Sequence, residues 1–250
     1  MIKQLVNRIP ILGPLARAIH RAWIKPAPPF SSSGDYWSKR YESGGNSGAG
    51  SYNKLREFKA EVLNAFVKDN EIAEIIEYGC GDGNQLLLSN YPAYVGYDIS
   101  PNAISRCREL FSEDQTKVFK LMDEYEGECA QLTLSLDVIF HLVEDNVFFE
   151  YMIRLFDSST CFVIIYSSNM DSEQEYHVRH RAFSNWIARE RPQWVLLKSI
   201  PNKYPFTGDN ATGSLADFYI YTKLPDNGQR GSVSYSNCTS SLKESTGVAS

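Results

Sequence analysis

Apolar residues along the middle of the chain recur with two different periods. Short apolar runs, typical of buried strands, cover residues 72–78, 94–98, 117–121, 131–136, 161–166, 194–200 and 215–224. Helical spacing instead predicts helices over 54–67, 84–90, 147–156 and 182–191, and the pair Ser100-Pro101 is typical of the start of one more. The run at 161–166 is the most apolar, and we expect it to be a central strand.

The order of these elements predicts the fold class. Strands that alternate with helices are typical of α/β proteins with a parallel, doubly wound sheet. No helical pattern separates the last two strands, so they should pair as an antiparallel hairpin. The expected architecture is a seven-stranded, mostly parallel, Rossmann-like sheet with a C-terminal antiparallel hairpin, in a domain over residues 35–224.

The two ends of the chain differ from this domain. Residues 1–34 hold basic but no acidic residues, and their apolar residues recur at helical spacing, although Pro10 and Gly13-Pro14 would interrupt a helix. We interpret residues 1–34 as a basic amphipathic arm with a linker at 26–34. The arm either lies on an anionic membrane surface or a partner, or packs on the domain as an ordinary helix. Residues 225–250 are rich in Ser, Gly, Asn and Thr, which is typical of a disordered tail.

Composition narrows the classes of function. A chain of 250 residues with 43% hydrophobic residues and a net charge of −5 is typical of a globular protein. Its pI of about 5.5 argues against a nucleic-acid binder. No run of eighteen apolar residues and no secretory signal pattern occurs, so we expect a cytoplasmic protein, at the inner membrane face if the arm binds lipid. The cysteines lack C-x-x-C spacing, and we expect no metal site.

A glycine-rich block carries the sharpest chemical signal. Residues 77–84, Glu-Tyr-Gly-Cys-Gly-Asp-Gly-Asn, follow the first predicted strand and precede a predicted helix. Glycine allows a turn with positive φ and the close approach of a ligand to the backbone, and a helix N-terminus offers free N–H groups. Asp98 ends the second strand, where a carboxylate can accept both hydroxyls of a ribose. The pattern therefore predicts a nucleoside cofactor.

Glu77 distinguishes between two such cofactors. A dinucleotide site prefers G-x-G-x-x-G, and Asn84 stands where that pattern has its last glycine. A carboxylate at Glu77 would repel a pyrophosphate, whereas it would attract a sulfonium ligand that carries an ammonium group. The residues therefore favour S-adenosylmethionine.

The segments EYGCGDGNQ, GYDIS and SLDVIFHLVED resemble the signature segments of class I S-adenosylmethionine-dependent methyltransferases. The resemblance covers residues 54–224. It implies that the glycine loop binds the methionine part, Asp98 the ribose and Asp123 the adenine side, and that the segment from Leu136 lines the active site. The implied cofactor-binding residues are Glu77, Gly79, Cys80, Gly81, Gly83, Asn84, Asp98, Ile99, Asp123 and Leu136.

A narrower resemblance concerns the methyl acceptor. The segments YWSKRYESGGNSGAGSYNKLREFKAE, IIYSSNM and HVRHR are similar to methyltransferases from bacterial surface-polysaccharide and glycan clusters. This implies O-methylation of a sugar, on a lipid-linked or polymeric glycan. Two alternatives stay open: a methyltransferase for a small metabolite or a lipid headgroup, and a catalytically inactive module of the same fold that serves as a scaffold.

A sugar hydroxyl is a poor nucleophile, so a general base should assist its methylation. His141, after the fourth strand, and His180, beyond the central strand, are the candidates, although His141 could instead only orient its loop. The candidate substrate-binding residues are Tyr36, Trp37, Arg40, Tyr41, His177, Arg179 and Arg181. The aromatic residues could instead pack on the domain, and the arginines could form a solvated basic loop paired with the acids of the preceding DSEQE segment.

Overall fold

The computed structural model describes residues 29–225, and the account below concerns the unit that begins at Ser32. A single seven-stranded sheet has the order β3-β2-β1-β4-β5-β7-β6. Its strands are β1 (Glu74–Tyr78), β2 (Ala93–Asp98), β3 (Lys117–Leu121), β4 (Ala130–Leu136), β5 (Ser159–Ser167), β6 (Trp194–Ile200) and β7 (Asp217–Lys223). All neighbours are parallel except β7, which is antiparallel to both β5 and β6. The predicted fold class is confirmed, and the most apolar run lies in β5, beside the middle strand β4.

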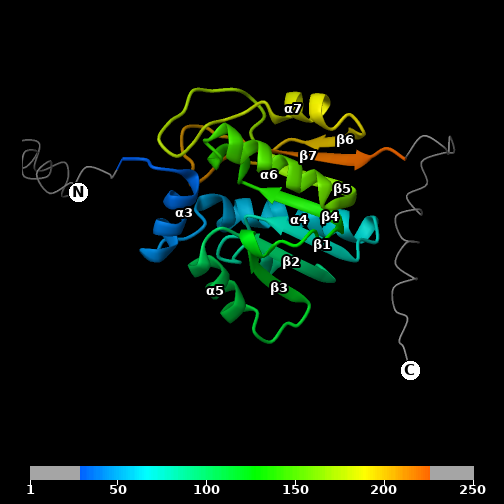
Figure 1. The fold of residues 1–250 in the computed structure, drawn as a ribbon, viewed down its shortest axis with the longest axis horizontal. Helices are drawn as coiled ribbons and strands as arrows, with labels where there is room; N and C mark the ends of the chain where they lie inside the picture. The colour runs from blue at the N-terminus through cyan, green and yellow to red at the C-terminus, as the bar shows by residue number, and fades with distance from the viewer. Residues whose placement is uncertain (1–28, 226–250) are drawn as a thin grey trace, which may run out of the picture. The chain divides into compact units, whose positions relative to one another are not determined.

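Helices cover both faces of this sheet (Figure 1). They are α3 (Ser33–Glu42), α4 (Asn53–Asp69), α5 (Pro101–Leu110), α6 (Asp145–Asp157) and α7 (Phe183–Glu190). One buried cluster joins α4 and α5 to the sheet, for example through Leu63 and Ile104, and the other joins α6 and α7 through Met152 and Trp186. The alternating strand residues therefore supply two cores, one on each face.

The helix predicted over 84–90 is wrong. Only a single 3₁₀ turn forms there, at Leu86–Leu88. Asn64 on α4 explains the early end, because its side chain donates to Leu88 O at 2.8 Å and accepts from Asn90 N at 2.8 Å. Two backbone groups of this segment, Leu88 O and Asn90 N, are thus hydrogen-bonded to a side chain of another helix. The glycine loop is therefore followed by a single turn and not by an extended helix.

Helix α3 was not predicted. It begins at Ser33, inside the segment interpreted as a linker, and the Ser32 side chain caps it by accepting from Asp35 N. The Ser-x-x-Asp spacing is a recognisable helix start, but the glycines that follow at 44–50 obscure it. The helix lies at the edge of the sheet where the parallel strands end (Figure 1).

The predictions of an arm and a tail concern mostly residues 1–28 and 226–250, which lie outside the described residues. Within residues 29–225, no helix combines the length and the apolar character needed to cross a bilayer.

Candidate functional site

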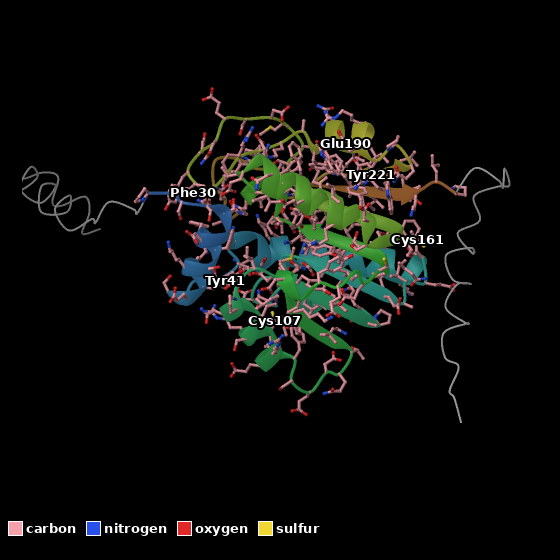
Figure 2. The ribbon with its side chains drawn as sticks, viewed as in Figure 1. Phe30, Tyr41, Cys107, Cys161, Glu190 and Tyr221 are labelled. Carbon is pink, nitrogen blue, oxygen red and sulfur yellow. The ribbon has the colours of Figure 1, made fainter. Side chains whose placement is uncertain are left out.

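The glycine loop turns sharply after β1 and leaves its backbone open to a cavity. Gly79 and Gly81 have φ values of 82° and 59°, in the region that disfavours other residues. A Cβ at Gly79 would lie 2.5 Å from Val138 Cγ2, and one at Gly81 would lie 2.3 Å from Ser47 Oγ. Neither position can therefore hold a larger residue. The loop is also braced from α5, since Cys107 Sγ donates to Gly81 O at 3.2 Å. Tyr41 on α3 lies close to the same turn, because its Oη would be 2.9 Å from a Cβ at Gly81. Figure 2 labels both side chains.

Asp98, at the end of β2, points its carboxylate back toward this loop. Gly81 N donates to Oδ2 at 3.0 Å and Ser100 N donates to Oδ1 at 2.9 Å. Burial raises the pKa of Asp98, and these backbone hydrogen bonds oppose the rise. Each carboxylate oxygen keeps a lone pair that a ligand hydroxyl can use.

Glu77 is a second buried carboxylate in the same wall. Tyr94 Oη donates to its Oε2 at 2.7 Å. Burial raises the pKa of Glu77 to about 7, against the opposing effects of the Tyr94 hydrogen bond and the nearby Lys59 ammonium. The side chain therefore lies close to its protonation midpoint at neutral pH, and a cationic ligand would favour its ionised form.

These groups border one cavity of about 440 Å³, large enough for a nucleoside amino acid. Of the predicted cofactor-binding residues, eight line it: Glu77, Gly79, Cys80, Gly81, Asp98, Ile99, Asp123 and Leu136. Gly83 and Asn84 do not. A Cβ at Gly83 would press on Phe111 and Cys107, and the Asn84 side chain donates to Ser51 O at 2.5 Å, so both positions serve packing around the loop.

Helix α3 and the segment after it form one side of the cavity. Trp37 and Tyr41 line it, whereas Tyr36 and Arg40 do not. At the start of α3, Ser33 Oγ donates to Glu144 Oε2 at 2.6 Å. Further along, Ser47 N donates to Asp82 Oδ2 at 3.0 Å, and Tyr52 Oη donates to the same oxygen at 2.9 Å. Hydrogen bonds at both ends thus hold residues 33–52 against the loops of the sheet.

His141 is the predicted histidine that lines the cavity. Its Nδ1 lies 3.2 Å from the carbonyl oxygen of His177. A carbonyl can only accept, so Nδ1 carries the proton and Nε2 keeps its lone pair. Burial lowers the pKa of His141 to about 3. The ring is therefore neutral at physiological pH and available as a hydrogen-bond acceptor.

The other predicted catalytic histidine, His180, and the remaining predicted substrate-binding residues lie away from the cavity lining. His177 stacks between Tyr36 and His141, with ring centroids 4.0 and 5.3 Å apart. His180 Nδ1 lies 2.5 Å from Ser168 Oγ.

The two predicted arginines of the HVRHR segment bind a neighbouring loop. Arg179 and Arg181 both donate to Asp145 Oδ1, at 3.0 and 2.6 Å. Pairing with the preceding DSEQE acids, the alternative weighed for these arginines, is therefore wrong.

A buried ion pair in the cavity wall was not predicted. Lys59 on α4 donates from Nζ to Asp137 Oδ2 at 2.7 Å, and both residues line the cavity. A sequence signal did exist: Lys59 stands four residues from both Leu55 and Leu63, on the apolar stripe of the helix. A lysine in that stripe is rarely buried without a partner.

Comparison with known proteins identifies the architecture. No protein-family model and no curated protein matches the chain. Among solved structures, the N-methyltransferase NodS from Bradyrhizobium japonicum WM9, in complex with S-adenosyl-L-homocysteine, superposes with a TM-score of 0.59 at 10% identity, over 78% of this chain and 100% of that one. The chain has the class I methyltransferase fold.

Two further structures agree with this assignment. Magnesium protoporphyrin IX methyltransferase (ChlM) from Synechocystis PCC 6803, with bound S-adenosyl-L-homocysteine, gives a TM-score of 0.53 at 13% identity, over 78% of this chain and 96% of that one. The methyltransferase domain of bacterial CtHen1 also gives 0.53, at 17% identity, over 68% and 100%. One of these structures is named as an N-methyltransferase and another as a methyltransferase of magnesium protoporphyrin IX. The methyltransferase fold by itself therefore does not define an acceptor.

Within residues 29–225 the methyltransferase fold brings together no group of three or more His, Cys, Asp or Glu side chains that could hold a metal ion. Separately, the carboxylates of Glu77 and Asp98 in the cavity lining suit a ligand with hydroxyl and cationic groups.

Proposed function

We propose that the protein binds S-adenosylmethionine and transfers its methyl group to a hydroxyl of a sugar or glycan. The observation that carries the proposal is the convergence of Glu77, the bare Gly79–Gly81 backbone and Asp98 on one cavity that His141 and Trp37 also line. Bound S-adenosylmethionine would supply an electrophilic methyl group on a positively charged sulfur. The three buried or half-buried acids Glu77, Asp98 and Asp137 suit that charge.

The short 3₁₀ turn behind the glycine loop supports this cofactor over a dinucleotide. A pyrophosphate site depends on the N-terminal dipole of a full helix, and here that helix is reduced to Leu86–Leu88. The buried carboxylate of Glu77 would also repel a diphosphate. A sulfonium amino acid carries no phosphate and does not need the dipole of a full helix.

The acceptor proposal rests on the side of the cavity formed by α3. Trp37 offers an aromatic face, and its ring centroid lies 4.8 Å from that of His141. An aromatic face beside a neutral hydrogen-bond acceptor suits the ring and hydroxyl groups of a sugar. His177 Nδ1, buried and without a hydrogen-bond partner among the described residues, adds a polar atom next to His141.

His141 would orient the acceptor hydroxyl rather than hold its proton. Nε2 can accept a hydrogen bond from the hydroxyl and direct an oxygen lone pair toward the methyl group. A pKa of about 3 makes the imidazolium costly at neutral pH, so the proton must pass on to solvent. The Trp37 ring and the neutral His141 ring would thus place no positive charge beside the reacting oxygen. This favours attack of that oxygen on the cationic methyl donor.

Labelled methyl transfer tests the proposed acceptor. The protein is incubated with S-[methyl-³H]adenosylmethionine and, separately, with glycan, lipid and small-molecule extracts. Label in the glycan fraction supports the proposal. Label confined to lipids or to small molecules would replace the acceptor class, and no transfer despite cofactor binding would favour the scaffold alternative.

Asp98→Asn should weaken S-adenosylmethionine binding. The substitution keeps the size of the side chain but removes the charge that receives the ribose hydroxyls. We expect a loss of roughly 10- to 100-fold in affinity, the usual range for a hydrogen bond to a charged group. Isothermal titration calorimetry measures it, and an unchanged dissociation constant would exclude Asp98 from the site.

His141→Phe should slow turnover without affecting cofactor binding. Phenylalanine keeps an aromatic ring beside Trp37 but removes the Nε2 lone pair that orients the acceptor hydroxyl, so we expect kcat to fall by about 100-fold. The dissociation constant for S-adenosylmethionine should change by no more than about threefold. Equal activity of variant and wild type would remove His141 from the reaction.

A further inference from the structure

Lys59 and Glu77 place opposite charges in the wall of the same cavity, near enough for the ammonium to lower the pKa of the carboxyl. Both side chains are buried, and both line the cavity. Lys59 Nζ donates to Asp137 Oδ2 at 2.7 Å and lies 5.3 Å from the Tyr166 ring centroid. Within residues 29–225 this is the one hydrogen bond of Nζ, although an ammonium carries three donors. Two donors of a fully buried cation therefore have capacity for a ligand.

The fold holds this cation in place at a cost. Burying an ammonium is unfavourable unless a partner compensates for the lost hydration. The partner, Asp137, has a φ of 59°, in the left-handed region that non-glycine residues avoid. Gly50 packs so closely on it that a Cβ there would lie 2.5 Å from Oδ2. The strained backbone at Asp137 and the requirement for glycine at position 50 both serve this ion pair. We take this as a sign that the pair has a specific function.

The charges in this wall match those of a sulfonium amino acid. An amino acid carries its ammonium and its carboxylate on one carbon, so a site for it needs an anion and a cation side by side. Ionised Glu77 and Asp137 with Lys59 sum to one negative charge. Bound S-adenosylmethionine contributes a zwitterion and one positive sulfonium, which offsets the net charge of these three side chains.

Resting on the proposed function, we propose that Lys59 binds the α-carboxylate of the methionine part of S-adenosylmethionine, and that Asp137 holds Lys59 in position for it. Glu77 then receives the α-ammonium group. The cofactor is thereby recognised as a complete amino acid, by three side chains from α4, β1 and the end of β4.

Decarboxylated S-adenosylmethionine, which keeps the sulfonium and the amine but lacks the carboxylate, isolates this contact. Calorimetric dissociation constants for both ligands are compared between wild type and Lys59→Met. We expect wild type to prefer the carboxylated ligand by roughly 10- to 100-fold. Lys59→Met should lose that preference through weaker binding of S-adenosylmethionine, with the decarboxylated ligand changed by no more than about threefold.

Two further variants serve as controls, one for loss of fold stability and one for loss of a lysine charge elsewhere on α4. Lys59→Met leaves Asp137 without its cation and could destabilise the fold, so the double variant Lys59→Met/Asp137→Asn provides a neutral pair of similar size. It should show the same loss of preference. Lys68→Met removes an exposed lysine from the same helix and should bind both ligands as wild type does.

The outcomes separate this proposal from the one on which it rests. Equal weakening of both ligands, or a double variant that still prefers the carboxylated ligand, would overturn the role of Lys59 while cofactor binding stands. Wild type that binds neither ligand would overturn the proposed function and this assignment together.

Discussion

Glu77→Gln should abolish tight cofactor binding and at the same time stabilise the ligand-free protein. Glutamine can still accept the hydrogen bond from Tyr94 but cannot pair with an ammonium group. Removal of one member of a buried charge pair usually costs several kcal/mol, so we expect S-adenosylmethionine to bind roughly 100- to 1000-fold more weakly. Calorimetry at pH 8, where wild-type Glu77 is ionised, measures the loss.

The stability gain follows from the direction of the pKa shift. Burial raises the pKa of Glu77 from 4.5 to about 7. The contribution of this group to stability is therefore complete below pH 4.5 and is lost as the pH rises through 7. Above that range the ionised carboxylate costs about 3 kcal/mol, which Glu77→Gln avoids. Urea unfolding of the ligand-free proteins should show the variant more stable at pH 8 and equal to wild type at pH 4.

The same titration predicts how wild type responds to pH. The ammonium of the cofactor binds the ionised form of Glu77, so affinity should rise with pH up to about 7 and then level off, with one proton released on binding below pH 7. Titrations in phosphate and in Tris buffer count that proton. Glu150→Gln removes an exposed carboxylate that also lines the cavity, and should leave the pH profile unchanged. A flat profile in wild type would contradict the assigned role of Glu77.

The cofactor end of this cavity could be predicted because its residues are close in the sequence. Residues 77–83 form one turn, and Asp98 ends the next strand, so strand periodicity alone sets both at the carboxyl edge of the sheet. The partners that tune these groups were harder to find. Tyr94 lies in a neighbouring strand, and Lys59 comes from a helix before the sheet, so their contacts depend on how layers pack rather than on local pattern.

The acceptor side was less predictable for a related reason. Glycines 44, 45, 48 and 50 are typical of a loosely structured segment. The chain instead forms α3 and then binds Asp82 through Ser47 and Tyr52. Over residues 84–90 the local pattern predicted a helix, and only a single 3₁₀ turn forms. There the Asn64 side chain from α4 binds the backbone that the helix would have used. In both segments, side chains distant in sequence override the local preference.

Arg181→Met should destabilise the fold rather than weaken acceptor binding. In the HVRHR segment too, contacts with residues distant in sequence decide the role of a side chain. Arg181 is 8% exposed. It donates to Asp145 Oδ1 at 2.6 Å and to Val143 O at 2.7 Å, and its guanidinium lies over the Phe148 ring. Arg179 also donates to Val143 O, but Leu142 O accepts only from Arg181 among the described residues. Methionine would leave that oxygen without a donor, so we expect the free energy of unfolding to fall by about 3 kcal/mol, measured by urea denaturation.

Arg179 provides a matched control two residues away. It reaches the same Asp145 oxygen at 3.0 Å, but its side chain is 35% exposed and water can replace its contacts. Arg179→Met should therefore cost only about 0.5 kcal/mol. If Arg181 instead bound the acceptor, Arg181→Met would keep wild-type stability and raise KM for the acceptor.

The location of Arg181 explains why a structural arginine could still affect catalysis. Ser33 Oγ, at the start of α3, accepts from Val143 N at 3.0 Å, so Arg181 and α3 bind the same short loop from two sides. That loop follows directly on His141 and Leu142, which line the cavity. Loss of Arg181 should therefore loosen both His141 and α3. At temperatures where Arg181→Met is still folded, we expect a lower kcat with an unchanged acceptor KM, a combination that direct acceptor binding by Arg181 would not produce.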